Sequence, residues 1–141
     1  MVGVFNLELA RMYGYLYQNT DKNYTILHAL DGYDEISLTG GTKTISNRME
    51  GMLHPSDFGL QTIEASKIAG GESIEESAQI FLNVLQGKGS DAQNQVVCAN
   101  AGVAIATAKG ISAKEGYEKA AEALHSGKAL NALKTLQQLS A

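Results

Sequence analysis

The chain has 141 residues, 44% of them hydrophobic, so we expect one compact domain built around one core. Its formal net charge of −4 argues against DNA or RNA as a partner, because a polyanion would be repelled overall. No apolar run approaches the roughly eighteen residues of a membrane span, and the start lacks the features of a signal peptide. Cys98 has no second cysteine to pair with, which fits a reducing compartment. These observations predict a cytoplasmic protein with no membrane partner.

The first half of the chain is predicted to be rich in strands. An amphipathic helix should begin after Asn6 and end near Gln18, because apolar residues recur there at intervals of three and four. The run YTILHAL that follows predicts a buried strand. The next expected elements are one or two strands in EISLT (35–39) and 42–46, a turn near Glu50 and Gly51, and a short helix in PSDFGLQ from Pro55.

Beyond Gly70 and Gly71 the sequence predicts four helices. Three of them should begin with a capping box, in which a serine caps the helix and a Glu or Gln three residues later bonds back to the serine. The boxes are Ser73 with Glu76, Ser90 with Gln93, and Ser112 with Glu115. The second of these helices, from Asp91 to Ala108, is apolar around most of its circumference, so it is predicted to be buried.

A strand-rich first half followed by a helical second half fits either an α+β domain or the back part of a larger α/β domain. Only about two to four short strands are visible, too few to cover one buried helix and three amphipathic ones. We therefore expect an α/β fold, in which the chain forms the C-terminal part of a mixed, mostly parallel sheet flanked by helices.

Asp34 and Glu35 are the candidate metal ligands. Mg²⁺ prefers hard oxygen ligands and is usually held by one or two carboxylates together with phosphate groups of a substrate. Both acids follow a predicted strand in a stretch loosened by glycines, and ligands bind at such strand ends in open α/β sheets. From spacing alone, a solvated acidic turn explains the same two residues.

The other polar residues give weaker signals. The Gly40-to-Thr44 stretch lacks the order of residues found in a phosphate-binding P-loop, and the glycines before the first capped helix fit a turn. His28 is expected to be packed and hydrogen-bonded, and Cys98 to lie in the core. No residue of the chain is assigned a catalytic or cofactor-binding role, and no histidine or cysteine pair has zinc spacing.

Four stretches in a fixed order resemble a known family. They are LHALDGYDEISLTGGT, HPSDFGL, AGGESIEESA and SGKAL, preceded by VGVFN near the start. In this order they resemble the C-terminal part of anthranilate phosphoribosyltransferase, and the resemblance covers nearly the whole chain. The Asp-Glu-Ile-Ser run followed by Thr-Gly is its most specific piece.

The resemblance implies transfer of a phosphoribosyl group from phosphoribosyl pyrophosphate to anthranilate, with release of pyrophosphate, in tryptophan biosynthesis. Mg²⁺ is the implied cofactor, and Asp34 and Glu35 match the acids that bind it in the family. The implied partners are the two substrates. A homo-oligomer is expected for a separate reason, because a truncated sheet cannot cover the predicted buried helix and strand, and its apolar surface and open edge favour self-association.

The sequence also departs from the family pattern. Gly41 stands where the family usually has Pro, Ala29 where it often has Gly, and Ser77 where it has Asn. The family's N-terminal helical domain and its Gly-Thr-Gly-Gly-Asp phosphate loop have no counterpart here. Residues 1–141 are therefore expected to be a C-terminal fragment of the α/β domain, without its first strands, and to be inactive alone.

Three other interpretations remain open on the sequence. A pyrimidine nucleoside phosphorylase would share the fold group, although the Asp-Glu-Ile-Ser run favours the transferase. A non-catalytic relative that binds nucleic acid would need a basic stripe, which the acidic balance of the chain does not supply. A stand-alone interaction module is supported only by the length of the chain.

Overall fold

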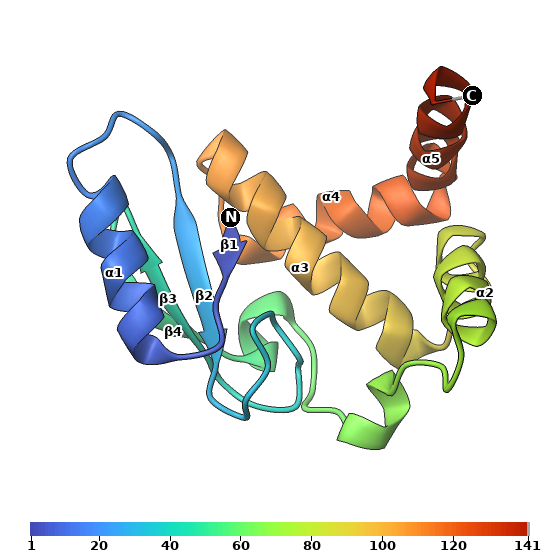
Figure 1. Cartoon of the computed structure of the whole chain (residues 1–141), viewed down its shortest axis with the longest axis horizontal. Helices are drawn as coiled ribbons and strands as arrows, with labels where there is room; N and C mark the ends of the chain where they lie inside the picture. Colours follow the sequence, from blue (N-terminus) through green and yellow to red (C-terminus); the bar gives the residue numbers. More distant parts are fainter. Residues whose placement is uncertain (141) are drawn as a thin grey trace.

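The computed structural model describes residues 1–140, which form a small sheet with helices on both of its faces (Figure 1). The sheet has the order β1 (Val2–Gly3), β2 (Thr25–Ala29), β3 (Thr42–Ser46), β4 (Glu50–Leu53). The helices are α1 (Leu7–Tyr17), α2 (Ile74–Leu85), α3 (Asp91–Lys109), α4 (Ala113–His125) and α5 (Lys128–Leu139), with the 3₁₀ helices η1 (Pro55–Phe58) and η2 (Ala65–Ile68). The expected α/β class is confirmed.

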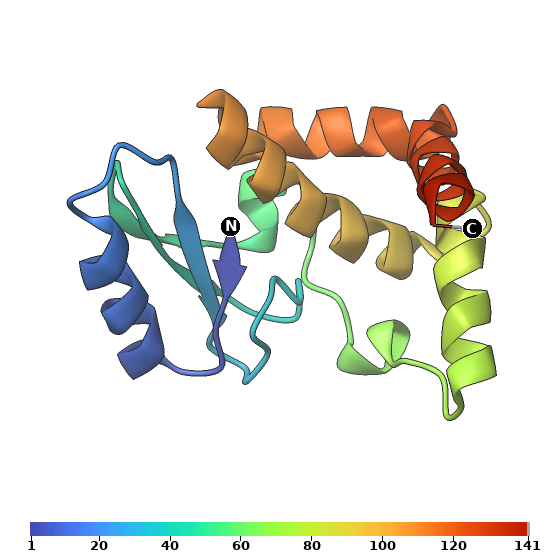
Figure 2. The ribbon, with the colours of Figure 1, turned by 45° about the horizontal axis from the view of Figure 1, so that its top comes forward.

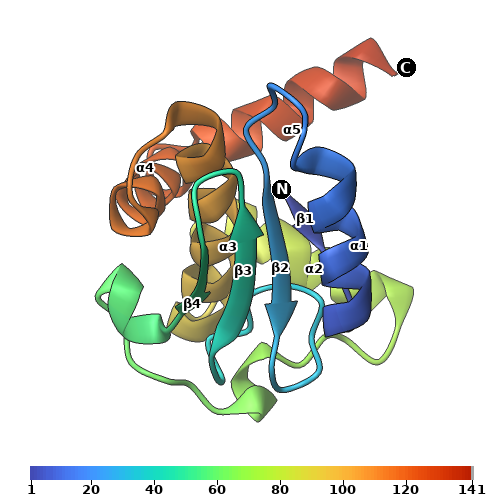
Figure 3. The ribbon, with the colours of Figure 1, turned by 90° about the vertical axis from the view of Figure 1, so that its left-hand side faces the viewer.

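Strand β2 lies at the centre of two cores. Successive strand residues point to opposite faces of a sheet, so Ile26 and Leu27 face different helices. Ile26 packs with Ala10 of α1, while Leu27 packs with Ala99 and Val103 of α3. Both strand residues are at most 1% exposed. The predicted buried strand is therefore confirmed, and its burial comes from α1 on one face and α3 on the other (Figure 3).

The sheet is mixed, but within residues 1–140 it is not mostly parallel. β1 and β2 pair in parallel, joined by the crossover helix α1, whereas β2–β3 and β3–β4 pair antiparallel. Connection length explains two of these pairings: the short turn between β3 and β4 requires antiparallel pairing, whereas the crossover through α1 is long enough for parallel pairing of β1 and β2. The predominance of parallel strands that we expected is thus not found in this part of the sheet.

Two expectations for residues 35–53 were wrong. EISLT is a loop rather than a strand, and the segment around Glu50 and Gly51 is strand β4 rather than a turn. The turn lies earlier, at Asn47 to Met49, where the Ser46 hydroxyl accepts hydrogen bonds from two backbone N–H groups. Leu38, inside EISLT, has a φ of 61°, a left-handed conformation that interrupts any strand.

Helix starts agree with the sequence prediction. The side chains of Asn6, Ser73, Ser90 and Ser112 each accept a hydrogen bond from a backbone N–H in the first turn of their helix. Both halves of the capping box form at Ser90 and Ser112. At Ser73 the second half differs, because the Glu76 carboxylate accepts from the backbone N–H of Glu72 instead. The short helix expected after Pro55 is the 3₁₀ helix η1.

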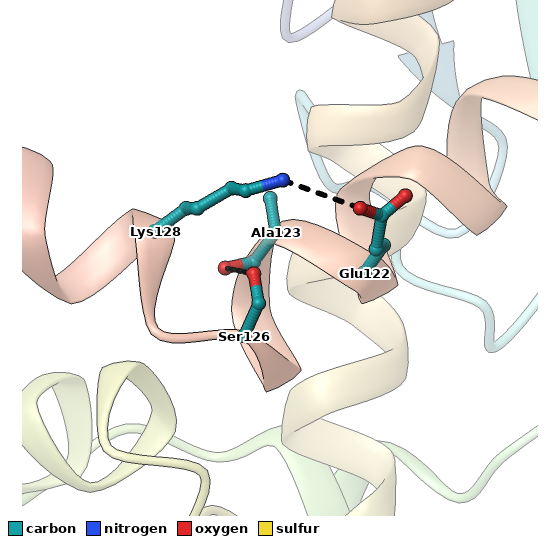
Figure 4. A network of polar contacts seen from close by, with 4 residues as sticks. All are labelled: Glu122, Ala123, Ser126 and Lys128. Carbon is teal, nitrogen blue, oxygen red and sulfur yellow. Dashed lines mark hydrogen bonds and ion pairs between the residues drawn. The ribbon is translucent and has the colours of Figure 1, made fainter.

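Helix α4 ends at a sharp corner before α5. Gly127 adopts a φ of 76°, which a residue without Cβ tolerates best. Across the corner, the Lys128 ammonium lies 3.2 Å from the Glu122 carboxylate, and the Ser126 hydroxyl bonds back to Ala123 (Figure 4). The ion pair is exposed on both sides, so it contributes little to stability and the corner depends mainly on the glycine.

Helix α3 is only partly buried, rather than buried throughout as predicted, since Val97 is 42% exposed. Its buried residues include Cys98, Ala99, Gly102 and Val103, and it packs along α4 through small residues (Figure 2). In residues 1–140, no single helix is long and apolar enough to cross a membrane; α3 and α4 together reach the length and composition of a span but are bent by 117° at their junction.

Apolar side chains are exposed on α1, α2 and α5. On α2, the side chains of Ile74 and Phe81 are 85% and 54% exposed, and on α5 Leu139 is 81% exposed. Helices α2 and α5 lie at the end of the molecule away from the sheet, where few other elements cover them (Figures 1 and 2). Apolar patches of this kind usually mark surfaces that bind other protein.

We expect the isolated chain to form dimers or larger species in solution, because association would cover this apolar surface and the open sheet edge. Light scattering at increasing concentration measures the mass. Replacing Ile74 and Phe81 together by Ser should shift the chain toward monomer, whereas Lys134→Ser on the exposed side of α5 should leave the mass unchanged. A parent chain that stays monomeric at high concentration and binds no hydrophobic dye would contradict this expectation.

Candidate functional site

Asp34 and Glu35 lie in the loop that joins β2 to β3, at the carboxyl end of β2. Both side chains are exposed, while Ile36, Ser37 and Leu38 directly after them are buried. The loop also approaches the carboxyl end of the parallel strand β1, because a Cβ atom placed on Gly3 would collide with the backbone carbonyl of Asp34. The two acids therefore stand where the carboxyl ends of two parallel strands meet, which is the usual ligand-binding edge of such sheets.

The third acid of the loop, Asp31, has a structural role. Its carboxylate accepts a hydrogen bond of 2.9 Å from the Ser37 hydroxyl and another from the Thr39 hydroxyl. Thr39 also donates its backbone N–H to the Ser37 oxygen, at 3.1 Å. At the base of the loop, the backbone N–H of Leu30 donates to the carbonyl of Gly41 at 2.9 Å. This network holds the segment EISLT as an ordered loop, and it engages Asp31 rather than Asp34 or Glu35.

Asn100 of α3 fixes the loop from the other side. Its amide oxygen accepts from the backbone N–H of Ile36 at 3.0 Å, and its amide nitrogen donates to the Ile36 carbonyl at 2.8 Å. This reciprocal pair replaces the bonds that a neighbouring strand would make, so the residue next to Glu35 has a fixed position. Sequence reasoning missed Asn100, although an amide inside the apolar run VVCANAGVAIATA is a signal, since a buried polar side chain needs a hydrogen-bond partner.

A shallow pocket of about 370 Å³ adjoins the two acids. Its lining includes Asp34 and Glu35, together with the apolar residues Ile68 and Val97 and the amide of Asn100. The lining is thus partly acidic and largely apolar. Within residues 1–140, no group of three or more acidic, histidine or cysteine side chains is close enough to hold a metal ion.

Two adjacent carboxylates on a rigid, exposed loop nevertheless fit Mg²⁺. This ion keeps several waters and commonly takes only one or two protein carboxylates, with phosphate groups filling the remaining positions. Neither acid makes a side-chain hydrogen bond or an ion pair among the residues that the structure describes, so both carboxylates have free oxygen atoms. The assignment of Asp34 and Glu35 as metal ligands remains a prediction.

The other candidates have structural explanations. His28 is hydrogen-bonded through Nδ1 to the carbonyl of Val4 at 2.9 Å, as expected for a packed histidine. Cys98 is buried, and its burial raises the pKa of the thiol, which disfavours the reactive thiolate. Lys43 pairs with Glu50 at 3.1 Å, and Thr42 is buried, so the Gly40-to-Thr44 stretch does not present a lysine to a phosphate.

Comparison with known proteins identifies a family. Residues 1–130 match the model of the glycosyl transferase family, a/b domain. The chain is 66% identical over 140 residues to the anthranilate phosphoribosyltransferase of Flavobacterium psychrophilum, covering 99% of this chain and 42% of that protein. It is 38% identical over 144 residues to the enzyme of the same name from Bacteroides fragilis, covering 43% of it.

Solved structures agree with these relatives. Anthranilate phosphoribosyltransferase from Thermus thermophilus superposes with a TM-score of 0.85 at 27% identity, over 94% of this chain and 40% of that chain. The enzyme from Saccharomyces cerevisiae in complex with PRPP and Mg superposes with a TM-score of 0.77 at 32% identity, over 94% of this chain and 38% of that chain.

The chain spans about two-fifths of the length of the curated relatives that it matches. Over that length the match is nearly continuous, and the mixed sheet with its flanking helices is shared with the solved structures. On this evidence the chain belongs to the glycosyl transferase family that carries this a/b domain, and its relatives are anthranilate phosphoribosyltransferases.

Proposed function

We propose that this chain is part of an anthranilate phosphoribosyltransferase, which transfers the phosphoribosyl group of phosphoribosyl pyrophosphate to the amine of anthranilate in tryptophan biosynthesis. The observation that carries the proposal is the 66% identity, over 99% of the chain, to a relative of that name. A relative with PRPP and Mg bound and another in complex with 4-fluoroanthranilate support the two substrates and the metal. We also propose that the enzyme acts in the cytoplasm, which its one buried free cysteine fits, and as a homo-oligomer, which would cover the apolar side chains exposed on α1, α2 and α5.

Asp34 and Glu35 are proposed to hold Mg²⁺ in this enzyme. When bound, the metal would supply positive charge that stabilises the pyrophosphate leaving group. The residues of this chain contribute a fixed pair of carboxylates: Asp31 and Asn100 order the loop through hydrogen bonds, so little conformational entropy is lost when the acids take up a ligand. No nucleophile of the protein is needed, because the amine of anthranilate attacks the ribose carbon directly.

Residues outside this chain are proposed to complete the substrate site. The pocket beside Asp34 and Glu35 is open and shallow, whereas small-molecule sites usually enclose most of their ligand. In our proposal the chain is the C-terminal part of the α/β domain, and the N-terminal helical domain and first strands of the same protein provide the remaining contacts. The names of the relatives favour the transferase over a nucleoside phosphorylase or a nucleic-acid-binding relative.

Anthranilate fluorescence tests the proposal. The full-length protein should consume anthranilate only when phosphoribosyl pyrophosphate and Mg²⁺ are both present, whereas the 141-residue chain alone should not exceed a blank. The full-length protein with uridine or thymidine and inorganic phosphate is the control for a phosphorylase. Phosphorolysis without anthranilate turnover would overturn the proposed reaction. Turnover by the 141-residue chain alone would overturn the proposal that residues outside this chain complete the substrate site.

A further inference from the structure

The two peptide groups that flank Glu35 are each held by a residue from another element. The peptide group before Glu35 lies against Gly3 of β1. The peptide group after it is hydrogen-bonded to Asn100 of α3. Figure 3 shows the loop that carries them at the bottom of the sheet, between β2 and β3. Because peptide groups are planar, holding both of them fixes the two backbone torsion angles of Glu35.

Gly3 leaves room for the loop because it has no side chain. A Cβ atom at this position would lie 3.0 Å from the carbonyl carbon of Asp34 and would collide with the oxygen of the same carbonyl. It would also lie 3.2 Å from the Cγ atom of Glu35, so the stem of this side chain runs directly past β1. Any larger residue at this position would therefore push both the loop and the Glu35 stem away from β1.

The end of β1 is itself held in place. Val4, directly after Gly3, is 3% exposed, and its backbone N–H donates to the carbonyl of Leu27 at 2.9 Å. Its carbonyl is hydrogen-bonded to Nδ1 of His28, also at 2.9 Å. Since both bonds tie β1 to β2, the clash of a Cβ atom on Gly3 would be relieved by movement of the loop rather than of the strand.

Asn100 holds the loop from α3. Its amide oxygen accepts from the backbone N–H of Ile36 at 3.0 Å, and its amide nitrogen donates to the Ile36 carbonyl at 2.8 Å and to the Val96 carbonyl at 2.9 Å. A planar side-chain amide presents an acceptor and two donors in fixed directions, which a hydroxyl or a carboxylate cannot replace. The neighbouring Ala99 is fully buried in the same core as Leu27, so α3 is a firm support.

We propose that Gly3 and Asn100 are positioning residues of the metal site, which fix Glu35 where it binds Mg²⁺ and so set the affinity for the metal. This inference rests on the proposed function, in which Asp34 and Glu35 hold the ion. A ligand that is already fixed loses little conformational entropy on binding, and replacing a residue that orients a metal ligand typically weakens metal binding by about 10- to 100-fold. The network around Asp31 holds residues 37 and 39, beyond the two acids.

Binding of Mn²⁺ to the full-length protein tests the proposal without substrate turnover. Mn²⁺ takes the same oxygen ligands as Mg²⁺, and its free concentration is measured by electron paramagnetic resonance. The double variant Asp34→Asn, Glu35→Gln defines how much of the binding belongs to this site. Gly3→Ala and Asn100→Ser should each weaken that part of the binding by about 10-fold or more. The serine hydroxyl cannot serve both backbone groups of Ile36 at once.

Each variant has a matched control. Gly51→Ala also replaces a strand glycine, but the nearest neighbour of its Cβ atom would be the Thr44 hydroxyl, at an ordinary 3.7 Å. Val84→Ala removes buried apolar atoms from the core around Cys98 and Leu124, so it lowers stability without touching the loop. Both controls should bind Mn²⁺ as the parent does. Urea unfolding of every variant shows whether a change in binding merely follows a change in stability.

The Mg²⁺ dependence of turnover separates positioning from a general loss of folded protein. Gly3→Ala and Asn100→Ser should raise the Mg²⁺ concentration needed for half-maximal rate, while the rate at saturating Mg²⁺ stays near that of the parent. Parent-like Mn²⁺ binding in either variant would overturn the role of that residue, and equal weakening in the controls would overturn both roles.

The acid variant distinguishes failure of this inference from failure of the proposed function. If Asp34→Asn, Glu35→Gln loses Mn²⁺ binding while the variants of Gly3 and Asn100 keep it, the metal assignment stands and only the positioning role is wrong. If the acid variant binds Mn²⁺ as the parent does, the two acids hold no metal, and the assignment and this inference are both wrong.

Discussion

Replacing Asp34 by Asn and Glu35 by Gln together in the full-length protein should lower turnover by roughly 10- to 1,000-fold, the scale of losing one electrostatic contributor. The change keeps the volume of both side chains but removes two negative charges, so Mg²⁺ would be held by fewer anionic ligands. A higher Mg²⁺ concentration should then be needed for half-maximal rate. The rate as a function of Mg²⁺ concentration is the measurement.

The fold should survive this double substitution. Both side chains are exposed, and such surface changes usually alter stability by no more than about 0.5 kcal/mol. Asp21→Asn with Glu118→Gln is the matched control, because it removes the same two charges from exposed positions on other elements. If the Asp34, Glu35 variant keeps both the rate and the Mg²⁺ requirement of the parent, the two acids are a solvated turn and the metal assignment is wrong.

Gly102→Ala should lower the free energy of unfolding by about 1–3 kcal/mol, the usual cost of an overpacked core. A Cβ atom on Gly102 would lie 2.6 Å from the backbone nitrogen of Tyr117 and 2.7 Å from its Cα. These are backbone atoms of α4, so relief requires the two helices to separate. The stability lost through this clash should exceed the gain of about 1 kcal/mol in helix propensity when alanine replaces glycine in a helix interior. Urea unfolding followed by circular dichroism measures it.

Gly14→Ala in α1 is the control for this experiment. It is also a buried glycine inside a helix, but a Cβ there would meet only the Ile45 methyl group, at 3.3 Å, which a small movement relieves. Its stability should stay within about 1 kcal/mol of the parent. Equal stability of Gly102→Ala and the parent would mean that α3 and α4 are not in backbone contact in solution.

The sequence predicted the helical half well because the signals that begin and end a helix are local. A serine cap, a Glu or Gln three residues later and a terminal glycine act within a few residues, and the helices begin and end where these signals stand. The buried strand β2 was also predictable, since only a core position accommodates such an apolar run. Asp34 and Glu35 became strong metal candidates through resemblance to a family, because their spacing alone fits a solvated turn equally well.

The tertiary structure decided what depends on distant partners. EISLT has the composition of a strand, yet Asp31 ties its hydroxyl groups and Asn100, 64 residues away, takes the backbone bonds of Ile36, so it becomes the loop that presents the two acids. Likewise, Gln18 and Asn47 are far apart in sequence, and the pairing of β2 with β3 brings the β3–β4 turn beside the end of α1. The sequence by itself determined where the helices begin, since caps and apolar periodicity act over single turns. Long-range hydrogen bonds and strand pairing decided which side chains share a site, and these interactions leave no local pattern in the sequence.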